Sequence, residues 1–412
     1  MLLVVLVIIQ TPLAIGFVLF LWRAKPIGND FSFCPKTAIL LPLRGADPFL
    51  EHCIASVLQQ DHPNYDVRIV IDSRDDPAWK VVHAVVERLG ATHVRIEVLH
   101  KIRDTCTLKI SGLLQLIEQL DESYEVVVLV DADMVAQPMW LRQLIAPMVD
   151  SRVGTTSGNR WFMPNDPSWG AIMRYLWNSA SVVQMLINGF PWAGSLATRA
   201  HLLRKPEVIE SLKHAFGDDS VLGLAAVQHG LTMVHVPELM MINRETCSVR
   251  GFMEFSFRQL LTVRLNHSRF PMVMLHGFAT SAALGATTIV MLLALISRNA
   301  LALELSVGGL WVYLVGMLLS LMALEAAVRR SVRLRGEPVD WITLATVAKI
   351  VLAIFPTQAI YTVTLIKSIT AKGFRWRGVD YKIGPGKQLH MLGYRPYRPA
   401  NAETAEHPQA SL

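Results

Sequence analysis

The stretch that most limits how this chain can fold is Val126 to Val130, an unbroken apolar run that ends at Asp131. A strand without polar alternation is typical of a parallel sheet, where helices cover both faces. Strand and helix patterns alternate around it, with strands at 37–43, 67–71 and 94–99 and helices at 47–60, 78–89 and 108–120. This order predicts an α/β domain over residues 36–270 with a mostly parallel sheet.

Acidic turns follow two of the predicted strands at their carboxyl ends, where such sheets bind ligands. Asp72 and Asp75 follow the second strand, and Asp131 and Asp133 follow the fourth. Neither GxGxxG nor GxxxxGK(S/T) follows the first strand, which argues against a dinucleotide enzyme and a P-loop NTPase. After the first strand, Asp47-Pro48 is expected to supply the N-cap and the first residue of a helix.

The Asp131-Ala-Asp133 pair suits a divalent cation, because Mg²⁺ and Mn²⁺ prefer oxygen ligands. A cation bound there would neutralise a diphosphate, which a nucleotide-sugar transferase needs for its leaving group. A third acidic turn, Asp218-Asp219, has two interpretations: an ordinary helix start, or a general base that takes a proton from an acceptor hydroxyl. Lys109 is a candidate for neutralising phosphate, and Trp192 is a candidate for lining an acceptor pocket.

Apolar residues make up 52% of the chain and charged residues 17%, which fits a soluble domain joined to membrane helices. Residues 1–22 are uncharged and are followed by Arg23 and Lys25, which favours a retained anchor over a cleaved signal peptide. It also favours a cytosolic domain after the anchor, since basic residues mark the cytosolic side. Further spans are expected at 272–297 and 305–324, with a basic cytosolic loop over 329–335.

The segment 341–366 is ambiguous, because Lys349 interrupts it and Pro356 is expected to break it. A simple crossing would place the basic segment 367–394 outside, so we expect a broken re-entrant helix or an interfacial helix, with that segment in the cytosol. Residues 395–412 are expected to be disordered. The net charge of +6 gathers beside the apolar spans, which favours a membrane surface over nucleic acid as the partner. The scattered cysteines indicate neither disulfides nor a zinc site.

Together these motifs resemble ceramide glucosyltransferase and its bacterial relatives, among the inverting glycosyltransferases with a GT-A fold. The resemblance is carried by 41–48 (LPLRGADP), 75–78 (DDPA), the Lys109 region, 130–133 (VDAD), 217–219 (GDD) and the tail 374–381 (FRWRGVDY). It implies a GT-A nucleotide-sugar-binding domain in an integral, multi-pass membrane protein whose catalytic domain is cytosolic. It also implies a UDP-sugar donor, a lipid acceptor that is ceramide-like or another membrane lipid, and Mg²⁺ or Mn²⁺.

Residue roles follow from the same resemblance. Asp75, with Asp72 near it, would contact the nucleotide. Asp131 and Asp133 would serve the metal and diphosphate, and Asp219 would be the base.

The family also carries a (Q/R)xxRW motif, and here the resemblance is incomplete. Arg258 fits the first position, and Leu261-Thr262 replaces the Arg-Trp pair. Arg264 is the candidate for the missing positive charge. Two alternatives therefore stay open beside lipid glycosylation: a polysaccharide synthase, and a catalytically impaired subunit that binds nucleotide sugars.

Overall fold

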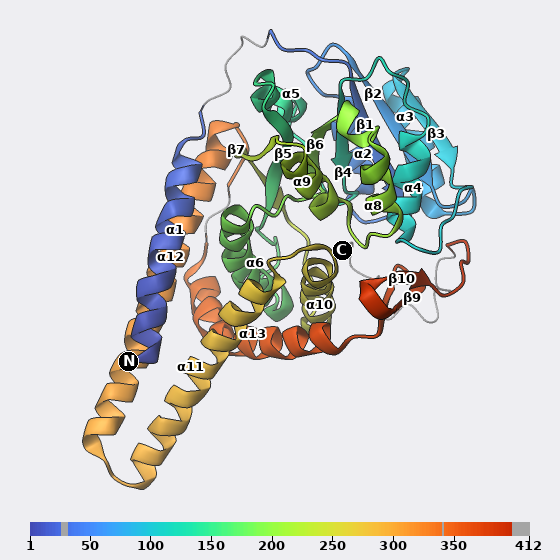
Figure 1. Ribbon diagram of the computed structural model, residues 1–412. Coiled ribbons are helices and arrows are strands. Elements are labelled where there is room, and N and C mark those ends of the chain that lie inside the picture. Colours follow the sequence, from blue (N-terminus) through green and yellow to red (C-terminus); the bar gives the residue numbers. More distant parts are fainter. Residues whose placement is uncertain (26–31, 340–341, 398–412) are drawn as a thin grey trace.

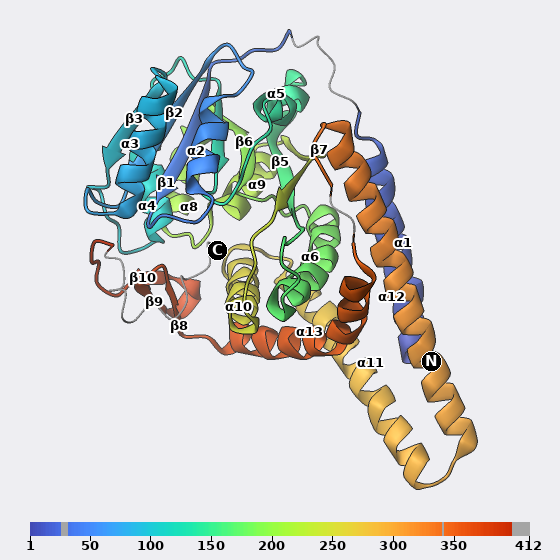
Figure 2. The ribbon, with the colours of Figure 1, turned by 180° about the vertical axis from the view of Figure 1, so that it is seen from behind.

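The computed structural model describes residues 1–25, 32–339 and 342–397 (Figure 1). It shows an α/β domain from which long helices extend to one side (Figures 1 and 2). The strands of the domain are β1 Thr37–Leu43, β2 Tyr65–Ile71, β3 Val94–Val98, β4 Val126–Val130, β5 Val153–Phe162, β6 Ser195–Arg199 and β7 Thr232–Asn243. Its helices are α2 Leu50–Leu58, α3 Pro77–Leu89, α4 Leu108–Ile117, α5 Trp140–Ile145, η1 Ala146–Val149, α6 Trp169–Asn188, α7 Ala200–Leu203, α8 Pro206–Lys213, α9 Asp218–Gln228 and α10 Val249–Asn266.

The seven strands form one sheet in the order β3-β2-β1-β4-β6-β5-β7. The pairs β1–β2, β2–β3, β1–β4 and β5–β7 are parallel, and β6 pairs antiparallel with both β4 and β5. The predicted α/β fold with a mostly parallel sheet is therefore confirmed. The antiparallel β6 separates the two parallel parts of the sheet.

Alternating side chains bury both faces of this sheet. In β1, Ile39 and Leu41 pack with α2, α3 and α5 on one face, whereas Ala38 and Leu40 pack with α4, α8 and α9 on the other. Every residue of β4 is buried, as expected for an apolar strand covered on both sides. The carboxyl ends of β1, β2 and β4 consequently meet at one edge of the sheet.

The start of the first helix differs from the prediction. Helix α2 begins at Leu50, and Phe49 rather than Asp47 is its N-cap. The Asp47 carboxylate instead accepts hydrogen bonds from both terminal nitrogens of Arg377, at 2.8 and 2.7 Å. A long-range ion pair thus replaced the local cap that the sequence indicated.

Within the described residues, four helices are long and apolar enough to cross a membrane: α1 Leu2–Trp22, α11 Phe270–Ile296, α12 Ala300–Leu334 and α13 Leu344–Thr370. The predicted apolar helices near the N-terminus and in the C-terminal part are therefore confirmed. Helices α11 and α12 form a hairpin whose turn lies far from the sheet, and α1 runs beside α12 (Figures 1 and 2).

The basic run 329–335 was predicted as a loop, and this prediction is wrong, since nearly all of it lies in the last turns of α12. This end of α12 packs on the domain. Buried Glu325 accepts hydrogen bonds from Trp161 Nε1 at 2.9 Å and from the Tyr175 hydroxyl at 3.0 Å. Arg335 Nη2 donates to the Met240 carbonyl at 2.9 Å.

Helix α13 is continuous through Pro356, so the predicted break at that residue is wrong. The helix lies across the base of the domain, below α6 and α10 (Figure 2). Near its start, Lys349 Nζ donates to the Pro167 carbonyl at 3.2 Å. Near its end, Arg264 Nη1 donates to the Ser368 carbonyl at 2.6 Å. Both ends of α13 are thereby fastened to the domain.

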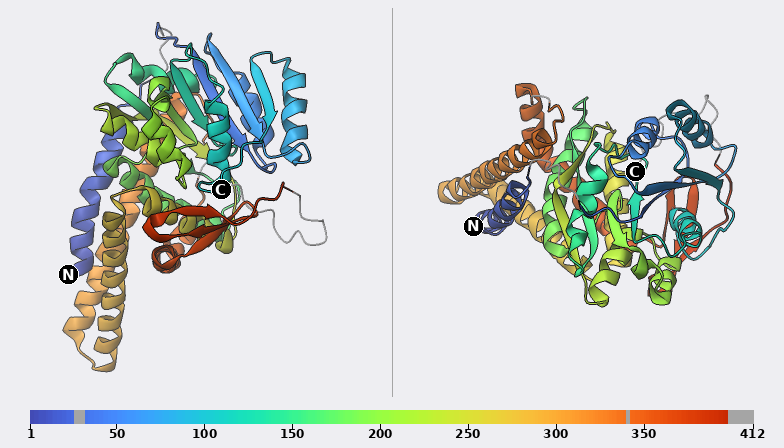
Figure 3. Two further views of the ribbon diagram at one scale, coloured as in Figure 1. Left: turned by 45° about the vertical axis from the view of Figure 1, so that its right-hand side comes forward. Right: turned by 90° about the horizontal axis from the view of Figure 1, so that it is seen from above.

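The basic segment after α13 folds into a small antiparallel sheet of β8 Gly373–Trp376, β9 Val379–Ile383 and β10 Leu389–Met391, with a 3-10 turn η2 at Pro385–Lys387. This tail sheet lies beside the end of α13 (Figure 3). Val379 and Tyr381 are buried against the α4 side of the domain core. Of the segment predicted to be disordered, 395–412, residues 398–412 lie outside the described residues, and Arg395 and Tyr397 bond to the domain.

Candidate functional site

A cavity of about 170 Å³ lies at the carboxyl edge of the sheet, and we call it the carboxylate cavity. It is enclosed by the ends of β1, β2 and β4, by α4, α9 and α10, and by the tail sheet. The predicted site residues that line it are Asp72, Lys109, Asp131, Asp133, Asp219 and Arg258. Segments from widely separated parts of the chain thus bring six predicted residues to one cavity.

The structure does not bring Asp75 into this group, because Asp75 is exposed and does not line the cavity. The adjacent Asp76 is buried. Asp76 caps α3 by accepting from Ala78 N at 2.8 Å, and it accepts from Gly45 N at 2.9 Å. Asp76 therefore holds the turns after β1 and β2 together.

Asp72 is buried and serves an intramolecular network. Its Oδ2 accepts from Arg44 Nη1 and from Tyr397 N, each at 2.6 Å. Its Oδ1 is buried without a hydrogen-bond partner among the described residues. Asp72 thereby joins the first two strand ends to the chain that follows the tail sheet.

Lys109 connects the second and third acidic turns. Its Nζ lies 2.8 Å from Asp131 Oδ1 and 3.1 Å from Asp218 Oδ1. Burial alone would lower the pKa of Lys109, but these carboxylates raise it above its ordinary value. Lys109 therefore stays charged and fixes the distance between the β4 turn and the start of α9. Asp218 was not among the predicted site residues.

Asp131 and Asp133 have the chemistry of a small cation site. Asp133 Oδ2 accepts from Arg160 Nη1 at 3.1 Å and from Asn243 Nδ2 at 3.3 Å. Burial raises the pKa of Asp133 to about 6 despite Arg160, and the neighbouring Asp131 carboxylate adds to this effect. No cluster of three or more His, Cys, Asp or Glu side chains arranged to hold a metal occurs within the described residues. Two carboxylates nevertheless fit Mg²⁺ or Mn²⁺, since Mg²⁺ commonly binds through one or two carboxylates together with substrate phosphates and water.

Asp219 and Arg258 differ from the other charged groups of the cavity. Asp47, Asp72, Asp131, Asp133 and Asp218 each pair with a cation, whereas neither Asp219 nor Arg258 forms an ion pair within the described parts of the chain. Asp219 Oδ1 accepts from Ser220 N at 2.6 Å. Burial raises the pKa of Asp219 to about 6, and the neighbouring Asp218 carboxylate contributes.

The Arg258 guanidinium is available to an anion. Burial lowers its pKa, and the adjacent Arg377 and Arg160 guanidinium groups lower it further. Mutual repulsion of these cations would be relieved by a bound anion. The cavity therefore contains a carboxylate and a guanidinium that are not held in ion pairs by other described residues.

The tail sheet supplies cavity residues that we did not predict, among them Trp376 and Arg377. The Trp376 ring stacks on Phe216 with centroids 6.0 Å apart, and the Arg258 guanidinium lies 5.3 Å from its centroid. Arg264, our candidate for the missing charge, is wrong for that role: it donates to the Ser368 and Ala371 carbonyls and does not line the cavity. The Trp-Arg pair in the tail was the sequence signal for these residues.

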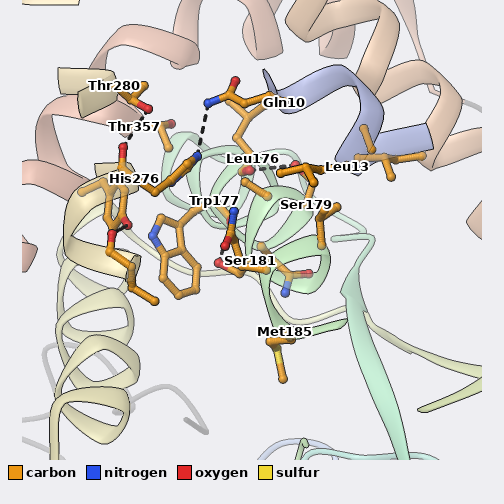
Figure 4. A pocket seen from close by; sticks show the side chains of 18 of the residues that line it. Gln10, Leu13, Leu176, Trp177, Ser179, Ser181, Met185, His276, Thr280 and Thr357 are labelled. Carbon is orange, nitrogen blue, oxygen red and sulfur yellow. Dashed lines mark hydrogen bonds between the residues drawn. The ribbon is translucent and has the colours of Figure 1, made fainter. Parts of the chain in front are cut away.

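A second cavity, of about 260 Å³, lies among α1, α6, α10, α11, α12 and α13, and we call it the helix cavity (Figure 4). Its lining is mainly apolar. The residues that line both cavities are Arg160, Trp192, Asp219, Gln259 and Thr262. The two cavities thus meet at Asp219, and Trp192, predicted for an acceptor pocket, lies at the same junction.

These features define an α/β protein with a charged cavity that opens toward long apolar helices. The chain belongs to glycosyl transferase family 21, whose model matches residues 3–389. This match confirms the family resemblance found in the sequence.

Curated relatives match over short stretches. A ceramide glucosyltransferase of Pyricularia oryzae is 38% identical over 61 residues, which are 14% of this chain and 12% of that protein. One of Komagataella phaffii is 34% identical over 58 residues, 14% of this chain and 11% of that protein. Among solved structures, the mannosyltransferase PcManGT from Pyrobaculum calidifontis in complex with GDP-Man and Mn²⁺ is 16% identical. The comparison covers 89% of this chain and 99% of that one, with a TM-score of 0.46.

Proposed function

We propose that this chain is a membrane-bound, inverting glycosyltransferase that moves a hexose from a UDP-sugar to a lipid acceptor. The observation that carries the proposal is the position of Asp219 where the charged carboxylate cavity meets the apolar helix cavity. A nucleoside diphosphate suits the charged carboxylate cavity, and a lipid suits the apolar helix cavity. The base that joins the two substrates must lie between them.

The proposed reaction is a single displacement. A hydroxyl of the acceptor attacks the anomeric carbon as the bond from that carbon to the diphosphate oxygen breaks, and UDP leaves. Asp219 takes the hydroxyl proton at Oδ2, since Oδ1 accepts from Ser220 N. Asp131 and Asp133 would hold Mg²⁺ or Mn²⁺, which supplies neutralisation of the leaving diphosphate when bound. Arg258 adds a further positive charge there.

The nucleotide is proposed to lie near Asp72 at the ends of β1 and β2. Because Asp72 fixes Arg44 in an ion pair, it acts on the nucleotide by positioning that guanidinium. Asp75 is exposed, so a contact with the donor would come from outside the carboxylate cavity.

We further propose that α1, α11 and the first part of α12 cross the membrane, that α13 lies at its surface, and that the domain is cytosolic. The ends of α1 and α12 and the start of α11 lie on the domain side (Figure 1). Arg23, Lys25 and the basic run 329–335 lie on this side too, as expected for a cytosolic face. Such a protein is integral and multi-pass.

The tail sheet favours an active enzyme over an impaired binding subunit. Although Leu261-Thr262 replaces the family's Arg-Trp pair, Trp376 and Arg377 bring an aromatic ring and a positive charge to the same cavity. The mainly apolar helix cavity suits a lipid better than a growing polysaccharide.

The substitution Asp219→Asn tests the proposal. We expect a loss of about 10²–10⁴-fold in transfer of radiolabelled hexose from UDP-sugars to extracted membrane lipids, because a general base contributes that much. Binding of UDP with Mn²⁺, measured by calorimetry, should be retained. The exposed Asp166 provides a matched control, Asp166→Asn, which should transfer normally. Full turnover by Asp219→Asn would exclude Asp219 as the base.

A further inference from the structure

Polar side chains face the helix cavity from four of the helices that surround it. Gln10 comes from α1, Asn178 from α6, His276 from α11 and Thr357 from α13. We call these four residues the polar belt. Gln10 Nε2 and His276 Nε2 are 3.2 Å apart and point toward one another (Figure 4). Four different helices thus place hydrogen-bonding groups around one space.

Two members of the polar belt have an unused hydrogen-bonding atom. Asn178 Oδ1 and Thr357 Oγ1 are buried and have no hydrogen-bond partner among the described residues. The two residues are only 5% and 7% exposed. A buried polar atom without a partner destabilises the protein. A threonine hydroxyl in a helix can usually donate to the backbone carbonyl of the preceding turn. A ligand in the cavity would supply the missing partners.

The charge of the lining restricts what this ligand can be. Among the described residues that line the helix cavity, the Asp, Glu, Lys and Arg side chains are limited to Arg160 and Asp219. Both lie where the two cavities meet. Arg160 is also paired with Asp133. An anionic group beside the polar belt would therefore lack a cation to pair with. The belt suits a neutral hydrogen-bonding group such as an amide or a hydroxyl.

The rest of the cavity sets the orientation of the ligand. Beyond the polar belt, Val7, Met317 and Leu321 of α1 and α12 provide an apolar wall. A molecule that fills the cavity would have its reactive hydroxyl at Asp219, a neutral polar group at the belt and its hydrocarbon between α1 and α12. This arrangement rests on the proposed function, since it takes the occupant to be the acceptor lipid.

We propose that Gln10, Asn178, His276 and Thr357 bind a second, neutral hydrogen-bonding group of the acceptor lipid and so determine which lipid is used. An acceptor that has only the reactive hydroxyl would leave Asn178 Oδ1 and Thr357 Oγ1 without partners. Sites built to hydrogen-bond a substrate reject analogues that lack the matching group. The polar belt therefore sets acceptor specificity, separately from the donor site.

The test compares three lipid probes with the purified full chain in detergent: a ceramide, a plain long-chain alcohol and an anionic phosphatidic acid. The first readout is competition by each probe against crosslinking of a photoactivatable ceramide. The second is transfer from UDP-sugars. For the wild type, we expect the ceramide to compete about 10-fold or more better than either of the other probes.

The variants Gln10→Leu and Thr357→Val should reduce that preference about 10-fold or more. The change should appear in the KM for the ceramide, with kcat and UDP binding retained, because the lost contact is one of binding. Thr288→Val on α11 is the matched control, since Thr288 is exposed and does not line the cavity. Thr357→Val keeps the shape of the side chain, so it tests the belt even where Gln10→Leu does not fold.

The outcomes separate the two proposals. Turnover with unchanged probe preference in both variants overturns the polar belt and leaves the proposed function intact. Selective competition without turnover of any UDP-sugar overturns the proposed function and supports the belt as a lipid site. Equal competition by all three probes in the wild type also overturns the belt.

Discussion

Asp219 carries a carboxylate whose pKa is raised to about 6, first by burial and then by Asp218. As the proposed general base, Asp219 must be unprotonated to act, so activity is expected above that pH and should be lost as the pH falls through about 6. We expect kcat/KM to decline on the acid side with this midpoint. Asp218→Asn removes the like charge and should move the decline to lower pH. A pH profile of both proteins checks this, and a shift in the opposite direction would contradict it.

Arg258 offers a second test at the level of a single side chain. Its guanidinium is expected to bind the diphosphate of the donor, because no carboxylate among the described residues pairs with it. Hydrogen bonds to charged groups contribute about 1.5–3 kcal/mol, so Arg258→Ala should raise the KM for the UDP-sugar about 10- to 100-fold. Arg258→Lys should recover part of this loss. Arg95→Ala, at an exposed position, is the control, and an unchanged KM in Arg258→Ala would refute the role.

Sequence patterns located much of the candidate site, because parallel strands place their carboxyl ends together. Asp72, Asp131 and Asp133 were predicted to share an edge of the sheet on this ground. The pattern could not show that Asp75 is exposed while the adjacent Asp76 is buried, since Asp76 is held in place by a hydrogen bond from Gly45 N in a different turn. Nor could it foresee that Asp218 binds Lys109, a contact between residues far apart in the chain.

At the level of elements, the tail sheet is an integral part of the domain. Arg377 of the tail and Asp47 of the β1 turn form a bidentate pair, and the Asp47 side chain is 5% exposed. Removal of one partner from a buried ion pair costs about 3–5 kcal/mol, because the other charge is left unpaired. Arg377→Ala should therefore destabilise the domain by about this amount. The double variant Asp47→Ala and Arg377→Ala should recover part of the loss.

Denaturant unfolding of the two single variants and the double variant gives the coupling energy directly. Additive effects would show that the pair contributes little, and the tail would then be held by the packing of Val379 and Tyr381. Both of these side chains are 2% exposed.

The elements that were predicted wrongly share a physical cause. Pro356 was expected to break a helix, because proline removes one backbone hydrogen bond. Packing against α6 and α10 keeps α13 helical, which outweighs the local cost. The run 329–335 appeared as a loop because it is polar, but buried Glu325 and Arg335 dock that end of α12 on the domain. In both places, long-range contacts determined the structure, and local composition alone gave the wrong prediction.

At the scale of the whole molecule, the arrangement of helices and domain serves one requirement. Under the proposed function, a water-soluble donor and a membrane lipid must meet at a single atom. The carboxylate cavity is formed by the sheet edge and the tail, and the helix cavity is formed largely by the apolar helices. Asp219 lies at the start of α9, where the two cavities join. A helix at the membrane surface, such as α13, would hold the domain at the height of the lipid head groups.

This arrangement predicts where each end of the chain lies relative to the membrane. If α1, α11 and α12 cross and α13 stays at the surface, the C-terminus is on the same side as the domain. The turn between α11 and α12 and the N-terminus are then on the other side. Protease should remove a C-terminal tag from inside-out vesicles, whose cytosolic face is outward, and should spare a tag placed at 297–299 or at the N-terminus. Detergent should expose all three tags. If the C-terminal tag is protected in these vesicles, α13 crosses the membrane, and the basic tail sheet could not then close the carboxylate cavity from the cytosol.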